Sequence, residues 1–247
     1  MRRTRILMGM PITVDVVASV DGAVVDSVFA YFERVDRRFS TYIAESEIQA
    51  INRGELTSAQ YSDEMREVLA LAKQTKSETD GFFDIRLAQG PIDPSGIVKG
   101  WAILNAARII IDLGARDFFI DAGGDIQSSG RNAAGSHWSV GIRSPFNAHE
   151  IVKVVYPRGR GVATSGTYVR GQHIYDPHAP GRLINEIVSL TVIGPDVLEA
   201  DRFATGAFAM GRAGIHFLER TPGLEGYVVD TSGHATLTSG FGAYCEP

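Results

Sequence analysis

The order of helix-like and strand-like patterns constrains the fold of this chain more than any other feature. Apolar residues recur with helical spacing at residues 24–38, 58–77 and 97–113. Strand-like runs occur at residues 12–17, 118–120, 138–142, 151–156 and 187–193. One more predicted helix runs from Asp196 to Gly211, and residues 227–238 have a hairpin pattern. Because strands and helices do not alternate strictly, we expect a mixed α/β fold with several antiparallel strand pairs, and not a doubly wound parallel sheet.

Length and composition are those of an ordinary globular protein. The 247 residues suffice for one domain with a sizeable core, and no linker-like stretch divides them, so we expect a single domain over residues 1–247. The net charge of -5 argues against nucleic acid as the main partner, but not against anionic small molecules bound in a local basic patch. The one cysteine, Cys245, excludes an internal disulfide.

The apolar runs predict neither a signal peptide nor a membrane span. Basic residues 1–5 precede an apolar stretch that Gly9, Pro11 and Asp15 interrupt, which is too short for a signal-peptide core. A run of about 18 apolar residues is also missing. We therefore expect a cytoplasmic protein, or an exported one if a leader precedes this sequence.

The predicted helix after Asp196 carries a pair of oxygen donors. Asp201 and Thr205 are four residues apart, so their side chains lie on one face, one turn from each other. A carboxylate and a hydroxyl are hard ligands of the kind that Mg²⁺ prefers. The small and apolar neighbours indicate a buried helix, in which a carboxylate needs a cation or hydrogen-bond donors. The alternative is an acidic residue that favours the helix dipole and a threonine on the surface.

The start of the helix predicted at residue 97 has features of an anion site. Gly96 lies where backbone N–H groups are free to meet an anion. Lys99 falls in the first turn, where the helix dipole disfavours a cation, and a phosphate bound there would offset that cost. An ion pair between Lys99 and Asp93 is the simpler alternative, and the sequence does not decide between the two.

Other segments add candidate groups. The strand at 118–120 runs into Gly123 and Gly124, which is typical of a tight turn. His173 and Tyr175 are expected to alternate on one strand face, where His173 is either a general base or a surface residue. Tyr42 either stacks on a flat ring or packs in the core. Because nucleophile elbow, P-loop, HExxH and GxGxxG patterns are absent, phosphate chemistry with a hard metal is the consistent option.

Taken together, these segments resemble the ApbE family of FAD:protein FMN transferases. The resemblance runs in order from Met8 to Gly211 and so covers most of the chain. Its segments are Met8-Gly9, residues 40–42, 46–48 with Asn52, 81–85, 96–100, 122–126, 163–166, 173–177, and 192–201 with Thr205. Each segment is weak alone, but their common order is specific.

The resemblance implies a single ApbE-like (T-fold-related) domain with mixed, largely antiparallel sheets packed by helices. It implies a Mg²⁺ ion held by Asp201, Thr205 and the backbone carbonyl of Gly96. It also implies residues that contact FAD, namely Asp93, Lys99 and Tyr175, and a lining of its flavin or adenosine part by Met8, Tyr42, Phe82, Phe83 and Asp84. His173 would deprotonate the acceptor. The implied reaction transfers FMN from FAD to a Thr or Ser hydroxyl of an acceptor protein and releases AMP.

The chain departs from the family pattern at a few points. Met10 stands where Thr is usual, and Gly96 stands where Ala or Thr is usual. The segment between Ser165 and His173 is trimmed. The stretch between Asp84 and Asp93 is short, whereas typical members carry there a long insertion with a tryptophan-containing loop that helps to enclose FAD. More open binding of FAD is expected, and two alternatives stay open: a flavin-binding protein without transferase activity, and a Mg²⁺-dependent FAD pyrophosphatase.

Overall fold

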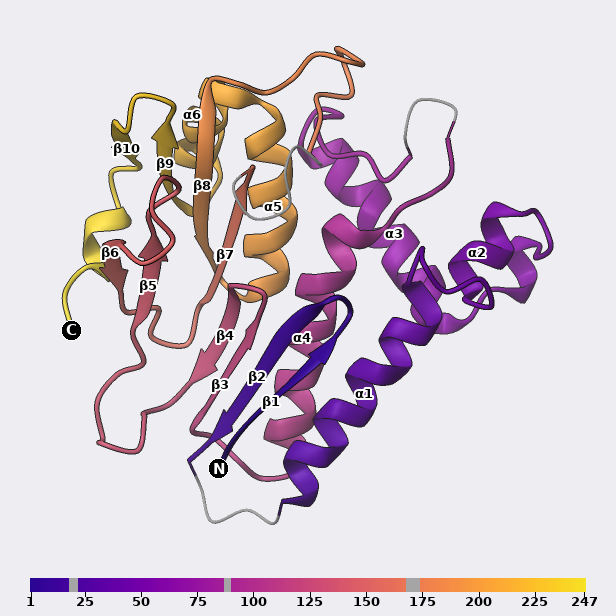
Figure 1. Ribbon diagram of the computed structural model, residues 1–247, viewed down its shortest axis with the longest axis horizontal. Coiled ribbons are helices and arrows are strands. Elements are labelled where there is room, and N and C mark those ends of the chain that lie inside the picture. The colour runs from indigo at the N-terminus through magenta and orange to yellow at the C-terminus, as the bar shows by residue number, and fades with distance from the viewer. Residues whose placement is uncertain (18–21, 87–89, 168–173) are drawn as a thin grey trace.

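An eight-stranded antiparallel sheet forms the centre of the molecule in the computed structural model, which describes residues 1–17, 22–86, 90–167 and 174–247 (Figure 1). The strand order is β1-β2-β3-β4-β7-β8-β9-β10. The bounds are Arg2–Leu7 (β1), Met10–Val16 (β2), Phe118–Ala122 (β3), Asp125–Ser129 (β4), Gly161–Gly166 (β7), Ile187–Gly194 (β8), Glu225–Asp230 (β9) and Ala235–Leu237 (β10). A separate antiparallel pair joins β5 (Val140–Arg143) to β6 (Ile151–Val155).

Helices α1, α4 and α5 pack along one face of this sheet, with α4 between the other two (Figure 1). Their bounds are Ala23–Phe39 (α1), Glu47–Asn52 (α2), Asp63–Glu78 (α3), Ser95–Asp112 (α4), Val197–Ala209 (α5) and Gly214–Arg220 (α6). Short 3-10 turns cover Ser58–Gln60, Gly211–Ala213 and Phe241–Tyr244. Among the described residues, no helix combines the length and apolar content that crossing a bilayer requires.

The core follows the alternation of side chains along the strands. Ile12, Val14 and Val16 of β2 are fully buried and belong to the cluster under α1 and α4. On the other face, Ile126 and Val162 pack with residues of β5, β6 and the C-terminal turn. The sheet is therefore covered by helices on one side and, over part of the other side, by the β5–β6 pair.

The expected elements are largely confirmed. The four long predicted helices correspond to α1, α3, α4 and α5, the runs at 138–142 and 151–156 pair as β5 and β6, and the terminal hairpin forms β9 and β10. Residues 58–77 split, because Ser62 caps α3 by accepting a hydrogen bond from the Met65 N–H. Tyr175 lies outside any strand, so the expected strand face of Tyr175 and His173 is wrong for Tyr175, and His173 lies outside the described residues.

Candidate functional site

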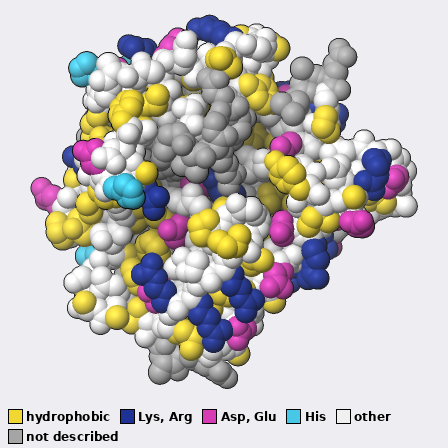
Figure 2. Space-filling model, in the orientation of Figure 1, with side chains coloured by type: hydrophobic (Ala, Val, Ile, Leu, Met, Phe, Trp, Pro, Cys, Tyr) yellow, Lys and Arg dark blue, Asp and Glu magenta, His cyan; other side chains and the backbone are white. Residues whose placement is uncertain are grey.

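A cavity of about 830 Å³ opens beside the start of α4. Its walls come from α4, α5, the β3–β4 turn, β5, β7 and the irregular segments around Phe83 and Tyr175. Figure 2 shows this face of the molecule hollowed near its centre, with charged side chains among those at the hollow. A cavity of this size lies within the range of small-molecule sites in proteins.

Helices α4 and α5 touch at Gly100, next to Lys99 of the cavity wall. A Cβ atom at Gly100 would lie 2.8 Å from Asp201 Cβ and 2.9 Å from the Val197 carbonyl oxygen. Only a residue without a side chain permits this approach. The Gly100 N–H donates to Asp201 Oδ2 at 2.8 Å, so the close approach also fixes the carboxylate against α4.

Lys99 lies between two buried carboxylates. Its Nζ is 2.6 Å from Asp125 Oδ2 and 3.5 Å from Asp201 Oδ1, and the two acids are 1% and 3% exposed. The Thr164 N–H also donates to Asp125 at 3.1 Å. Burial raises the pKa of the Asp201 carboxyl, and Lys99 lowers it by less. Two acids thus share one ammonium group in a region where an uncompensated carboxylate is costly.

This arrangement differs from the Lys99–Asp93 ion pair, which was one of the two alternatives that the sequence left open. The Asp93 carboxylate instead accepts a hydrogen bond from the Ser95 N–H at 3.0 Å, while the acids beside Lys99 are Asp125 and Asp201. The sequence analysis gave Asp125 no role. Its position directly after two glycines, as the first residue of a strand, could have indicated one. Gly123 and Gly124 form the predicted tight turn, with φ of 63° and 98°.

The three predicted magnesium ligands lie together. Thr205 Cγ2 is 3.5 Å from the position that a Cβ atom of Gly96 would take, and Thr205 Oγ1 donates to the Asp201 carbonyl oxygen at 3.2 Å. Asp201 reaches the same helix one turn further along, at Gly100. Gly96, Asp201 and Thr205 therefore meet at the start of α4, on the wall of the cavity.

Most residues predicted to contact FAD also line this cavity, namely Phe82, Phe83, Asp84, Asp93, Lys99 and Tyr175. The Tyr175 hydroxyl donates to the Asp84 carbonyl oxygen at 3.1 Å. Burial raises the pKa of Tyr175, and the negative charges of Asp84 and Asp93 raise it further. The hydroxyl therefore stays protonated and able to donate.

The structure does not bring every predicted residue to the cavity. The described residues that line it include neither Met8 nor Tyr42. Tyr42 lies in the turn that follows α1 and is 96% exposed. Met8 lies in the β1–β2 turn with φ 52°, and its neighbours Gly9 and Met10 line the cavity in its place.

Backbone contacts join the two ends of the short stretch between Asp84 and Asp93. Arg86 and Ile92 form an isolated antiparallel bridge, and the Asp93 N–H donates to the Ile85 carbonyl oxygen at 2.7 Å. This bridge brings Asp84 and Asp93 to the same cavity wall.

Comparison with known proteins identifies the family of this chain. The model of the ApbE family matches residues 8–90 and 88–228. The chain belongs to the ApbE family. A FAD:protein FMN transferase of Salmonella typhimurium is 30% identical to it over 156 residues, which cover 60% of this chain and 45% of that protein. The FAD:protein FMN transferase of Escherichia coli K12 is 31% identical over 156 residues, 60% of this chain and 44% of that protein. The ApbE chain thus matches less than half the length of these curated relatives.

Solved structures confirm the mixed, largely antiparallel ApbE fold. The ApbE protein from Thermotoga maritima superposes with a TM-score of 0.90 at 21% identity, over 100% of this chain and 99% of that one. The flavin transferase ApbE from Vibrio cholerae has a TM-score of 0.85 at 21% identity, over 99% of this chain and 98% of that one.

Proposed function

We propose that this protein is a FAD:protein FMN transferase, which moves FMN from FAD to a Thr or Ser hydroxyl of an acceptor protein and releases AMP. The observation that carries the proposal is the meeting of Gly96, Asp201 and Thr205 beside Lys99, on the wall of one cavity. Membership of the ApbE family and the activity named for its relatives support it.

The residues at the start of α4 fit a divalent cation. Asp201, Thr205 and the Gly96 carbonyl offer a carboxylate, a hydroxyl and a backbone oxygen, which are hard donors. The carboxylates of Asp125 and Asp201 outnumber the Lys99 ammonium group, so a cation balances the local charge. The Gly100 N–H, whose regular helical acceptor is the Gly96 carbonyl, is drawn toward Asp201, and this weakens the hold of the helix on that carbonyl. Bound there, Mg²⁺ would supply neutralisation of the diphosphate charge.

The chain's own residues then orient FAD. Backbone N–H groups at the start of α4 and the Lys99 ammonium group favour a diphosphate at this position. The Tyr175 hydroxyl is a donor at the cavity wall, and Phe82 offers an apolar surface to a flat ring. In the reaction, the acceptor oxygen bonds to the FMN phosphorus, the bond from that phosphorus to the AMP oxygen breaks, and the hydroxyl proton passes to a base. His173 is the predicted base.

Incubation with FAD, Mg²⁺ and a Thr-containing acceptor peptide tests the proposal. AMP release is followed by chromatography, and flavin that stays on the peptide after denaturation is followed by fluorescence. Asp201→Asn is expected to abolish both products. Asp196→Asn is the matched control, because Asn keeps the hydrogen bond that Asp196 accepts from the Glu199 N–H at the start of α5. AMP without labelled peptide would instead identify a pyrophosphatase, and intact bound FAD would identify a flavin-binding protein.

A further inference from the structure

Arg202 follows Asp201 on α5 but projects toward a different neighbour. Successive helical residues point about 100° apart, so Asp201 reaches α4 while Arg202 reaches α3. Arg202 is only 4% exposed. A fully charged guanidinium group in such a position needs partners for its donors.

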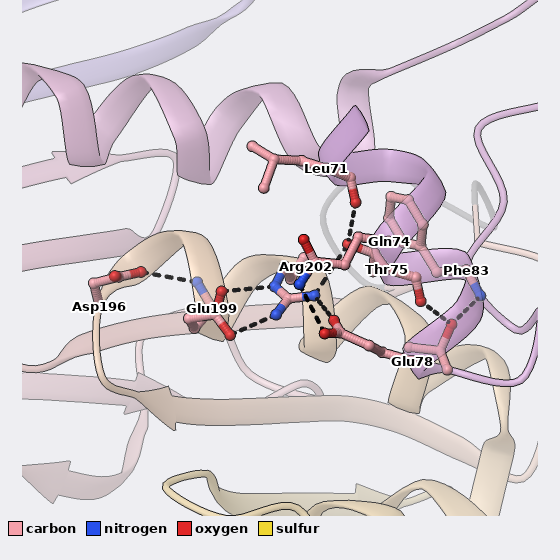
Figure 3. Close-up of polar contacts among 9 residues, drawn as sticks. Leu71, Gln74, Thr75, Glu78, Phe83, Asp196, Glu199 and Arg202 are labelled. Atoms are coloured by element: carbon pink, nitrogen blue, oxygen red, sulfur yellow. Dashed lines mark hydrogen bonds and ion pairs between the residues drawn. The ribbon is translucent and has the colours of Figure 1, made fainter. Parts of the chain in front are cut away.

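The partners of Arg202 come from two helices, as Figure 3 shows. On α5, its Nε and Nη2 donate to the two oxygens of Glu199, at 2.8 Å and 2.6 Å. On α3, its Nη1 donates to Thr75 Oγ1 at 3.2 Å and to Glu78 Oε2. Glu78 also accepts from Gln74 at 2.8 Å. One arginine thus joins two carboxylates and ties α5 to the last turns of α3.

The end of α3 leads directly into the wall of the cavity. Thr79 Oγ1 accepts a hydrogen bond from the Phe83 N–H at 3.0 Å and donates to the Thr75 carbonyl oxygen, so the segment that carries Phe82 and Phe83 is fixed to this helix end. Gly206 of α5 packs here as well, since a Cβ atom on it would lie 2.7 Å from Thr79 Cγ2. A shift between α3 and α5 therefore changes the distance between Asp201 and Thr205 on one side and the Phe83 segment on the other.

We propose that Arg202 is a positioning residue for the cation and dinucleotide site. It sets the rotation and the position of α5 relative to α3, and through α5 it holds the Asp201 and Thr205 oxygens at the start of α4. The inference rests on the proposed function for the identity of the ligands, but not for the geometry of the arginine.

The two glutamates that Arg202 joins would repel each other without it. Glu78 and Glu199 both contact the same guanidinium group, so they lie near each other across the α3–α5 interface. Replacement of Arg202 by Met leaves two like charges that repel at this boundary. Removal of one of those charges, by Glu78→Gln, relieves the repulsion. Neither change removes an oxygen atom from the proposed cation site.

A second arginine offers a matched control. Arg38 also lies between two glutamates, with its Nε 3.2 Å from Glu47 Oε2 and its Nη1 paired with Glu64. These three residues belong to α1, α2 and α3, and none is among the described residues of the cavity wall. Arg38→Met therefore breaks an ion-pair cluster of the same composition, one arginine and two glutamates, away from the site.

The test measures Mn²⁺ binding to the purified protein by electron paramagnetic resonance of the free ion, without added nucleotide, because a diphosphate such as ADP binds Mn²⁺ itself. Thermal unfolding of each variant is recorded, and binding is measured at least 15 °C below the lowest midpoint (about this margin keeps each variant folded). We expect Arg202→Met to raise the Kd for Mn²⁺ about tenfold, which corresponds to about 1.4 kcal/mol. Arg202→Met with Glu78→Gln should recover roughly half of that loss on a logarithmic scale. Arg38→Met should leave the Kd within about twofold of wild type.

The possible outcomes separate the inference from the proposed function. Equal Mn²⁺ affinities for Arg202→Met and Arg38→Met would overturn the positioning role while leaving the cation site intact. No recovery on adding Glu78→Gln would likewise overturn it. A wild-type protein that binds no Mn²⁺ would reject the cation site itself, and the role of Arg202 with it.

Discussion

Adding one methyl group at Gly100 tests the contact between the two helices that carry the site. In Gly100→Ala the new Cβ atom would lie 2.8 Å from Asp201 Cβ and 2.9 Å from the Val197 carbonyl oxygen. Carbon atoms at rest are about 3.5–4.0 Å apart, so α5 has to move away from α4. This movement stretches the hydrogen bond from the Gly100 N–H to Asp201 Oδ2, which is 2.8 Å long.

The magnitude follows from three effects. Overpacking in a core costs about 1–3 kcal/mol, and loss of a hydrogen bond to a charged group costs about 1.5–3 kcal/mol. Alanine recovers about 1 kcal/mol as the better helix former. The net loss is about 3 kcal/mol in the middle of these ranges, which lowers the Tm of a chain of this size by about 6–12 °C.

Gly96→Ala, one turn earlier on α4, is the control. Its Cβ atom would lie 3.5 Å from Thr205 Cγ2, an ordinary contact, and 3.3 Å from Phe83 Cε2, so only the edge of the Phe83 ring has to shift slightly. We expect its Tm within about 3 °C of wild type. Thermal unfolding followed by circular dichroism compares the two variants under one buffer condition. A Gly100→Ala protein as stable as Gly96→Ala would refute the close contact at Gly100.

Three further substitutions test other contacts. Lys99→Met leaves the buried Asp125 and Asp201 without their ammonium group. The free energy of unfolding in EDTA should therefore fall by about 3–5 kcal/mol. Added Mg²⁺ should raise the Tm of this variant more than that of wild type, and equal increases in Tm would contradict the prediction. Gly161→Ala would overlap the backbone of Val197, so soluble yield should collapse, whereas Gly242→Ala, with nothing within 4 Å, should express normally. Ser62→Ala removes the cap of α3 and should cost about 1 kcal/mol, seen as a Tm lower by about 2–4 °C, while Ser62→Asp, which keeps a cap, should not show this loss.

Local patterns made the helices and one half of the site predictable. Apolar spacing located α1, α3, α4 and α5, because each of these helices buries one face or more. Asp201 and Thr205 were recognisable as a pair because four residues bring two side chains to one helical face. These signals lie within single elements and need no knowledge of how elements pack.

Contacts between elements that are far apart in the sequence were harder to predict. The pairing of Lys99 with Asp125 joins α4 to β4, whereas the only acidic partner weighed from the sequence was the nearby Asp93. Strand β1 escaped prediction because its arginines and threonine lie at the outer edge of the sheet, where apolar alternation is not required. Strand β7 begins and ends with glycine. Glycine is typical of turns, so this segment is recognised as a strand only from its pairing with β4 and β8.

The contact between Gly100 and Asp201 joins residues 101 positions apart. During synthesis on the ribosome, Gly96 and Lys99 are translated about a hundred residues before their partners on α5. A nascent chain that stops before Asp201 lacks the α5 carboxylate that is proposed to bind the cation. The proposed cation site can therefore form only after α5 has been synthesised and has packed against α4.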